Sequence, residues 1–99
     1  MMIDKTINDK KAEFFIEGRL DTVTGPELQD ELIPAFDSYT DVILDFAQVN
    51  YISSAGLRVL LIGQKTAAAK KALFTIRNVS DEVMEILNMT GFSDILTIV

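Results

Sequence analysis

The sequence predicts an α/β fold, with a mixed β-sheet and helices packed mainly on one face, in the order β-β-α-β-α-β-α-β. Short runs rich in β-branched and aromatic residues alternate with segments of helical periodicity. Each strand–helix–strand unit implies parallel neighbours joined by a right-handed crossover. Two strand-like runs in succession open the chain, which adds an antiparallel hairpin to this parallel arrangement.

The hairpin is expected from the first twenty residues. Ile3–Ile7 and Ala12–Leu20 are strand candidates, and the segment Asn8-Asp9-Lys10-Lys11 between them has the polar character of a turn. Gly18 interrupts the second strand and is expected to mark a bulge or a close approach of another chain segment.

A helix start follows. Thr24 is predicted to cap the helix, Glu27 to complete a capping box, and Pro26 to fit the first turn. Pro34 should kink the helix or weaken its last turn. Residues at helical spacing predict the buried face: Leu28, Leu32, Ala35 and Phe36.

The second half of the chain supplies the remaining units. Asp41–Phe46 is a nearly continuous apolar run, typical of a central strand covered on both faces. The run Leu57–Ala72 predicts a long helix, and Leu73–Arg77 the next strand. Ser80-Asp81-Glu82 is expected to cap a third helix, and Ile95–Val99 to form a last strand or a strand–helix remnant.

Composition restricts the possible functions. The 99 residues make one small domain, residues 1–99, with a net charge of −6 that disfavours nucleic acid and anionic membranes as partners. The sequence has no cysteine and no histidine, so it lacks thiol chemistry and the usual catalytic base, and we expect no metal and no cofactor. We find no signal-peptide pattern, and the longest apolar run is too short to span a bilayer. We therefore expect a cytoplasmic protein, by default a monomer.

One segment points to a specific function. The sequence Tyr51-Ile-Ser-Ser-Ala-Gly-Leu-Arg58 follows the predicted central strand and opens the long helix. Ser53 and Ser54 therefore lie where unpaired backbone N–H groups and the positive end of the helix dipole converge. A phosphate on either serine would be well placed there.

These residues resemble the anti-sigma-factor antagonist family, whose fold is the STAS domain. The resemblance covers most of the chain, and its most specific part is the central strand with the serine loop. The matching segments are Gly18-Arg-Leu-Asp21 with Thr24 and Glu27-Leu28, Val42-Ile-Leu-Asp-Phe46, Val49-Asn-Tyr-Ile-Ser-Ser-Ala-Gly-Leu57, and Met89-Thr-Gly-Phe92.

The resemblance implies a phosphorylation switch. Such a protein binds an anti-sigma factor that is also an ATP-dependent serine kinase, is phosphorylated by it and released, and is restored by a PP2C-type phosphatase. The family's acceptor lies two residues before a glycine, which is Ser54 here. Many members have an aspartate at the position of Ser53, so Ser53 is the alternative acceptor. The implied partner-binding residues are Asp21, Thr22, Ser53, Ser54, Ala55, Gly56, Leu57 and Arg58.

Other interpretations stay open at this point. The serines could be helix caps of a constitutive interaction module that regulates a target other than a sigma factor. Asp21 could cap the next helix instead of contacting a kinase, and Asp45 could be a partly buried carboxylate held by backbone N–H groups. We do not expect an enzyme, because a nucleophilic Ser54 would have no histidine base and Lys65 should lie about three helical turns away.

Overall fold

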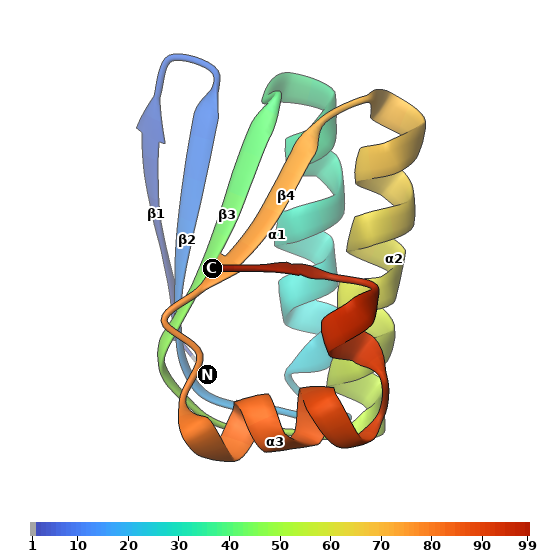
Figure 1. The fold of residues 1–99 in the computed structure, drawn as a ribbon. Coiled ribbons are helices and arrows are strands. Elements are labelled where there is room, and N and C mark those ends of the chain that lie inside the picture. The colour runs from blue at the N-terminus through green and yellow to red at the C-terminus, as the bar shows by residue number, and fades with distance from the viewer. Residues whose placement is uncertain (1) are drawn as a thin grey trace.

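The computed structural model describes residues 2–99 and contains one five-stranded sheet in the order β1-β2-β3-β4-β5 (Figure 1). β1 is antiparallel to β2, and the remaining neighbours are parallel, so the mixed sheet is confirmed. The strands are β1 (Met2–Asn8), β2 (Lys11–Leu20), β3 (Asp41–Ile52), β4 (Leu73–Arg77) and β5 (Thr97–Ile98).

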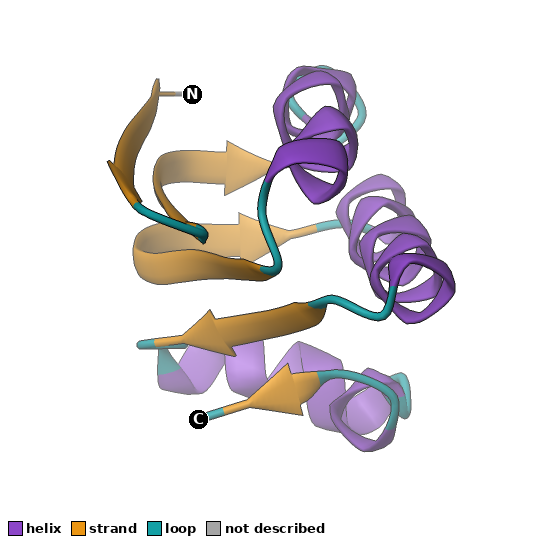
Figure 2. Ribbon diagram, turned by 90° about the horizontal axis from the view of Figure 1, so that it is seen from above, coloured by secondary structure: helices purple, strands orange, loops and turns teal. Residues whose placement is uncertain are grey.

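Two of the three α-helices cover one face of this sheet. Helices α1 (Gly25–Ser38) and α2 (Ser54–Lys70) lie side by side there, while α3 (Asp81–Met89) runs across the end of the sheet (Figures 1 and 2). A short 3-10 helix, Phe92–Asp94, precedes β5. The predicted element order and the placement of helices mainly on one face are confirmed. No helix within residues 2–99 is both long and apolar enough to cross a membrane.

The core lies between the sheet and the α1–α2 layer. β2 alternates buried and exposed residues, and the predicted face of α1 is buried. β3 is central and buried along its whole first half, as expected. α3 also packs against β3, with Val83 and Leu87 buried. The largest fully buried side chains include Phe14, Phe46, Ile16, Leu28, Leu32, Leu44, Leu60, Ile76 and Leu87.

Local signals at turns and caps were mostly reliable. Asp9 adopts a positive φ of 56° in the hairpin turn, and Gly18 has a φ of 112° beside a register shift between β2 and β3. The Ser80 hydroxyl accepts a hydrogen bond from the Val83 N–H at 3.2 Å, so the predicted cap of α3 is confirmed. The last strand covers only Thr97–Ile98 of the predicted range Ile95–Val99, since Ile95 and Leu96 form a turn after the 3-10 helix.

Two predicted boundaries were wrong, those of β3 and α2. β3 extends to Ile52, because beyond Asp45 it continues to pair with β2 through to Leu20. α2 begins at Ser54 and ends at Lys70, where the left-handed conformation of Lys71 stops it. α1 continues through Pro34 to Ser38 without interruption. Proline lacks the N–H that would donate to the carbonyl of Asp30, and Asp30 lies on the exposed side of the helix.

A polar network fixes the face of the sheet opposite α1 and α2. Asp45 is 7% exposed and accepts hydrogen bonds from the Ala47 N–H at 2.9 Å, the Arg77 Nε at 3.0 Å and the Asn78 Nδ2 at 2.9 Å. Arg77 also donates to Glu13 at 2.6 Å. The expected backbone contact is confirmed, and side chains supply the remaining bonds. The network therefore ties β2, β3 and β4 together.

Replacing Asp45 by Asn should destabilise the protein by about 1 to 2 kcal/mol, because a charge-assisted bond to Arg77 is lost. Burial would raise the pKa of Asp45, but the bonds from Ala47, Arg77 and Asn78 together hold it below its ordinary value of 3.8. The contribution of the Asp45 carboxylate to the free energy of unfolding should therefore be fully present above pH 3.8. It should be lost as the pH falls through the lower pKa of the folded state. Urea unfolding of both proteins from pH 7 to pH 3 tests this.

Asp37 offers a matched control, since it pairs with Lys70 at 2.7 Å but its side chain is 64% exposed. Asp37→Asn should change the unfolding free energy by less than about 0.5 kcal/mol. Equal losses for the two variants, or a loss for Asp45→Asn that is independent of pH, would contradict the proposed role of the network.

Candidate phosphorylation and partner-binding site

The two serines lie at the junction of β3 and α2. Ser53 occupies the N-cap position with extended backbone, and Ser54 is the first residue of the helix. The Ser53 N–H donates to the Leu20 carbonyl at 2.9 Å, and the Ser53 carbonyl accepts from the Leu57 N–H at 2.9 Å. The junction is thus fixed to the end of β2 on one side and to the first helical turn on the other.

The environments of the two hydroxyls differ. Ser54 is exposed, whereas the Ser53 Oγ is buried and has no hydrogen-bond partner among residues 2–99. Ser53 is in the cap position, yet its side chain accepts no bond from the helix. Only Ser54 therefore presents a hydroxyl to an enzyme approaching from solvent.

Gly56 lets this junction pack closely against β2. A Cβ atom built on Gly56 would lie 2.7 Å from the Ile52 Cγ1, 2.8 Å from the Leu20 carbonyl oxygen and 2.9 Å from the Leu20 Cγ. The same carbonyl oxygen accepts the Ser53 N–H. The absence of a side chain at Gly56 thus holds the serine backbone at one fixed position.

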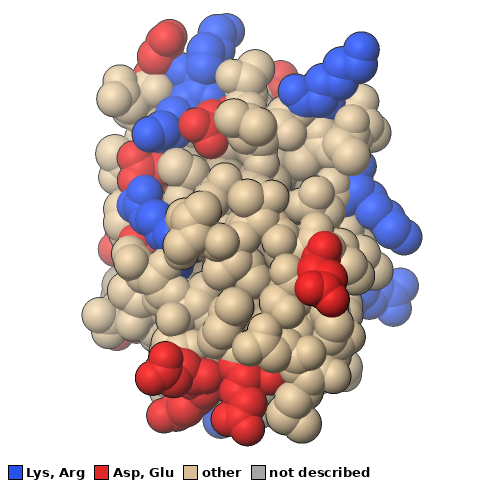
Figure 3. Space-filling view, in the orientation of Figure 1, with Lys and Arg blue, Asp and Glu red and all other residues tan. Residues whose placement is uncertain are grey.

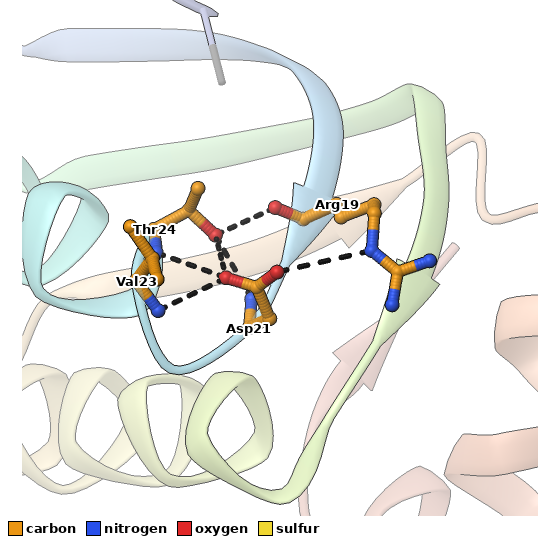
Figure 4. Close-up of polar contacts among 4 residues, drawn as sticks. All are labelled: Arg19, Asp21, Val23 and Thr24. Carbon is orange, nitrogen blue, oxygen red and sulfur yellow. Dashed lines mark hydrogen bonds and ion pairs between the residues drawn. The ribbon is translucent and has the colours of Figure 1, made fainter.

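The loop from β2 to α1 is organised by Asp21 (Figure 4). Its Oδ1 accepts from the backbone N–H groups of Val23 at 3.0 Å and Thr24 at 3.1 Å, and its carbonyl accepts from the Gly25 N–H at 2.7 Å. The hydrogen bond from the Thr24 backbone lowers the pKa of Asp21 below its usual 3.8, even though partial burial works against this. Asp21 is therefore ionised near neutral pH and caps the turn that leads into α1.

The predicted capping box at Thr24 and Glu27 is therefore wrong. The Thr24 hydroxyl donates to the Arg19 carbonyl at 2.6 Å and accepts from the Asp21 N–H at 2.9 Å, so it is already engaged (Figure 4). Thr24 itself has helical backbone angles and makes no side-chain cap bond. Asp21, three residues earlier, takes the capping role.

The Asp21 loop lies beside the first turns of α2. Leu20 bonds Ser53, and a Cβ atom built on Gly25 would lie 3.5 Å from the Val59 Cγ2 and 3.6 Å from the Ala55 carbonyl oxygen. The structure thus brings Asp21 and Thr22 close to the serine segment. Within that segment the side chains of Ser54 and Arg58 are exposed and Ala55 is half-buried, while Gly56 and Leu57 are buried and contribute by packing.

Sequence reasoning missed exposed residues around this site. Val23 is 75% exposed at the tip of the Asp21 loop, and Tyr51 is 38% exposed next to the serines. The Arg19 guanidinium lies over the Tyr51 ring at 4.3 Å and within 3.8 Å of the Asp21 carboxylate. The signal in the sequence was that Arg19 and Tyr51 each stand near the end of a predicted or neighbouring strand, β2 and β3.

The charge distribution is uneven. Figure 3 shows acidic side chains gathered at the end of the molecule where α3 lies, which is also the end at which α2 begins (Figure 1). Asp81, Glu82 and Glu85 are exposed on α3. Among the described residues no cluster of His, Cys, Asp or Glu has an arrangement that could hold a metal ion.

Comparison with known proteins identifies the family. The family model for the STAS domain matches residues 2–99. The chain belongs to the STAS-domain family. This STAS domain is 30% identical over 95 residues to the anti-sigma-B factor antagonist of Staphylococcus aureus, an alignment that covers 95% of this chain and 88% of the relative. The resemblance inferred from the motifs is therefore confirmed.

Solved structures agree on the fold. An anti-sigma factor antagonist from Mycobacterium paratuberculosis has a TM-score of 0.86 at 18% identity and covers 98% of this STAS domain with 83% of its own chain. The anti-sigma factor antagonist SpoIIAA from Bacillus matches in its unphosphorylated form with a TM-score of 0.78 at 13% identity, covering 99% of this chain and 87% of its own. The phosphorylated form of SpoIIAA gives 0.77 at 14% identity, covering 99% and 91%.

Proposed function

We propose that this STAS domain is a cytoplasmic anti-sigma factor antagonist controlled by phosphorylation of Ser54. Unphosphorylated, it binds an anti-sigma factor that is also a serine kinase, and phosphorylation releases it from that partner. A PP2C-type phosphatase restores the unmodified state. The observation that carries the proposal is the exposed Ser54 hydroxyl at the start of α2, on a backbone held by the bond between Ser53 and Leu20.

The acceptor chemistry demands little of this chain. The γ-phosphoryl group passes from ATP to the Ser54 Oγ, ADP leaves, and the hydroxyl proton passes to a base of the kinase. The kinase supplies nucleotide, metal and base, so the absence of histidine is no obstacle. What this STAS domain must supply is a solvent-facing hydroxyl at a reproducible position.

A phosphate at this position should leave the fold intact. Unpaired N–H groups and the positive end of the α2 dipole favour an anion there. The two forms of SpoIIAA match this chain with nearly the same TM-score, which supports the same expectation. The switch would then act on the interface directly, because a partner seated over Ser54 has to desolvate about 1.5 to 2 negative charges.

The partner surface that we propose combines two segments. Thr22 and Val23 supply exposed groups from the Asp21 loop, and Ser54, Ala55 and Arg58 supply the start of α2. The apolar Val23 and the adjacent polar groups have the mixed character usual for a reversible interface. Asp21 is ionised and partly exposed, and its second oxygen lies 3.8 Å from the Arg19 Nε, so the loop presents a carboxylate and a guanidinium together.

Phosphorylation by a candidate anti-sigma factor kinase with ATP tests the proposal. Intact mass and site mapping should show one phosphate on wild-type protein and on Ser53→Ala, and none on Ser54→Ala. The matched pair separates the two hydroxyls, of which the structure exposes only one. Phosphate on Ser54→Ala would move the acceptor to Ser53. Kinase binding without any phosphate on the wild-type protein would favour a constitutive interaction module.

A further inference from the structure

Arg58 lies one helical turn beyond Ser54 on the same face of α2. Both residues are exposed, and four residues separate them along an uninterrupted helix. Side chains at this spacing are neighbours, with Cβ atoms about 6 Å apart. The long arginine side chain can therefore reach a group attached to the Ser54 Oγ without any change in the backbone.

The charge of Arg58 is unpaired in the unmodified protein. Within residues 2–99, Arg19 and Arg77 each form an ion pair, and Arg58 forms none. Arg58 also stands in the second turn, near the positive end of the helix dipole, where a cation is unfavourable. α2 itself contains no acidic side chain that could pair with Arg58.

The other helices supply a negative charge themselves. The first turn of α1 contains Glu27, and the first turn of α3 contains Asp81 and Glu82. The first turn of α2 contains no acidic residue. An anion on Ser54 would therefore satisfy both the free N–H groups of α2 and the charge of Arg58.

We propose that Arg58 is the internal counter-ion of the phosphate on Ser54. This inference rests on the proposed acceptor and adds a role for the residue next to it. Before modification Arg58 presents a positive charge to the partner. Afterwards the guanidinium donates to phosphate oxygens, and the net charge of the pair becomes about −0.5 to −1. Phosphorylation would then remove a cation from the partner surface in the same event that adds an anion.

Phosphoserine installed at position 54 during translation tests the pairing without any kinase. The second pKa of the phosphate, followed by ³¹P NMR, should be lower in the protein with Arg58 than in Arg58→Gln, because a cation stabilises the dianion. An i,i+4 pair predicts a difference of about 0.15 to 0.4 of a pH unit at low salt. The difference should shrink at high salt, since both groups are exposed.

Lys65→Gln is the matched control. Lys65 is an exposed cation on the same helix, eleven residues from Ser54, and its removal alters the net charge equally. It should leave the phosphate pKa unchanged. Equal pKa values in the wild-type and Arg58→Gln backgrounds, or equal effects of both substitutions, would overturn the pairing. Because the phosphoserine is installed directly, this measurement does not depend on a kinase. Failure of kinases to modify Ser54 would contradict the proposed switch but would not affect the test of the pairing.

Discussion

Phosphoserine at position 54 is expected to weaken binding to the anti-sigma factor kinase on the order of 100-fold, equivalent to roughly 3 kcal/mol. The reason is local, because Ser54 is exposed beside the Asp21 loop, and the phosphate would be buried against the partner. Desolvation of the anion and steric conflict both oppose binding. Calorimetric titration of the kinase with the unmodified and the phosphoserine proteins measures the ratio.

Ser38 provides the control for added charge. It is exposed at the C-terminal end of α1, whereas Ser54 opens α2 at the opposite end of the molecule (Figure 1). Phosphoserine at position 38 should leave the affinity within about two-fold of the unmodified value, because at physiological salt the charge is screened over that separation. Similar losses from both modifications would mean that net charge, and not occupation of the interface, controls binding.

Circular dichroism of the phosphoserine-54 protein should be unchanged, since the phosphate lies at a helix N-terminus that favours anions. Unfolding by the modification would contradict a surface switch and would show that Ser54 belongs to the core.

Elements whose signals are local were predictable from sequence. The hairpin turn at Asp9, the bulge at Gly18 and the cap at Ser80 each depend on residues within a few positions. The element order followed from alternating periodicity, because each strand and helix is long enough to show its own pattern.

Features that depend on distant neighbours were not predictable. The capping box failed because the Thr24 hydroxyl is held by the Arg19 carbonyl at the end of β2. β3 is twice the predicted length because its second half pairs with β2, and no signal within the segment reveals that partner. Both errors arise where the local structure depends on contacts with β2, which form only when the sheet is assembled.

The same limit applied to the candidate site. The serine motif placed both hydroxyls at a helix start, but it could not distinguish them. In the folded protein the Ser53 backbone bonds Leu20 and its hydroxyl is buried, whereas Ser54 is exposed. Tertiary packing therefore buries one hydroxyl and exposes the other, although the two residues are locally equivalent.

That packing makes the protein's stability sensitive to substitution of Gly56. Gly56→Ala is expected to lower the unfolding free energy by about 2 to 3 kcal/mol. The added Cβ would lie 2.8 Å from the Leu20 carbonyl oxygen and 2.7 Å from Ile52, so strand and helix must separate. The usual gain of alanine over glycine in a helix, about 1 kcal/mol, offsets only part of this. Urea unfolding followed by circular dichroism measures the change.

Gly25→Ala is the matched control, because Gly25 is also buried in the first turn of a helix that borders the site. Its added Cβ would meet only ordinary contacts at 3.5 and 3.6 Å, so stability should stay within about 1 kcal/mol of the wild-type value or rise. If Gly56→Ala were as stable as Gly25→Ala, the close approach to Leu20 would not constrain the loop. If it is destabilised as expected, the separation of strand and helix should also displace the Ser53 N–H from Leu20, and kinase phosphorylation of Ser54 should slow even under conditions where the variant is fully folded.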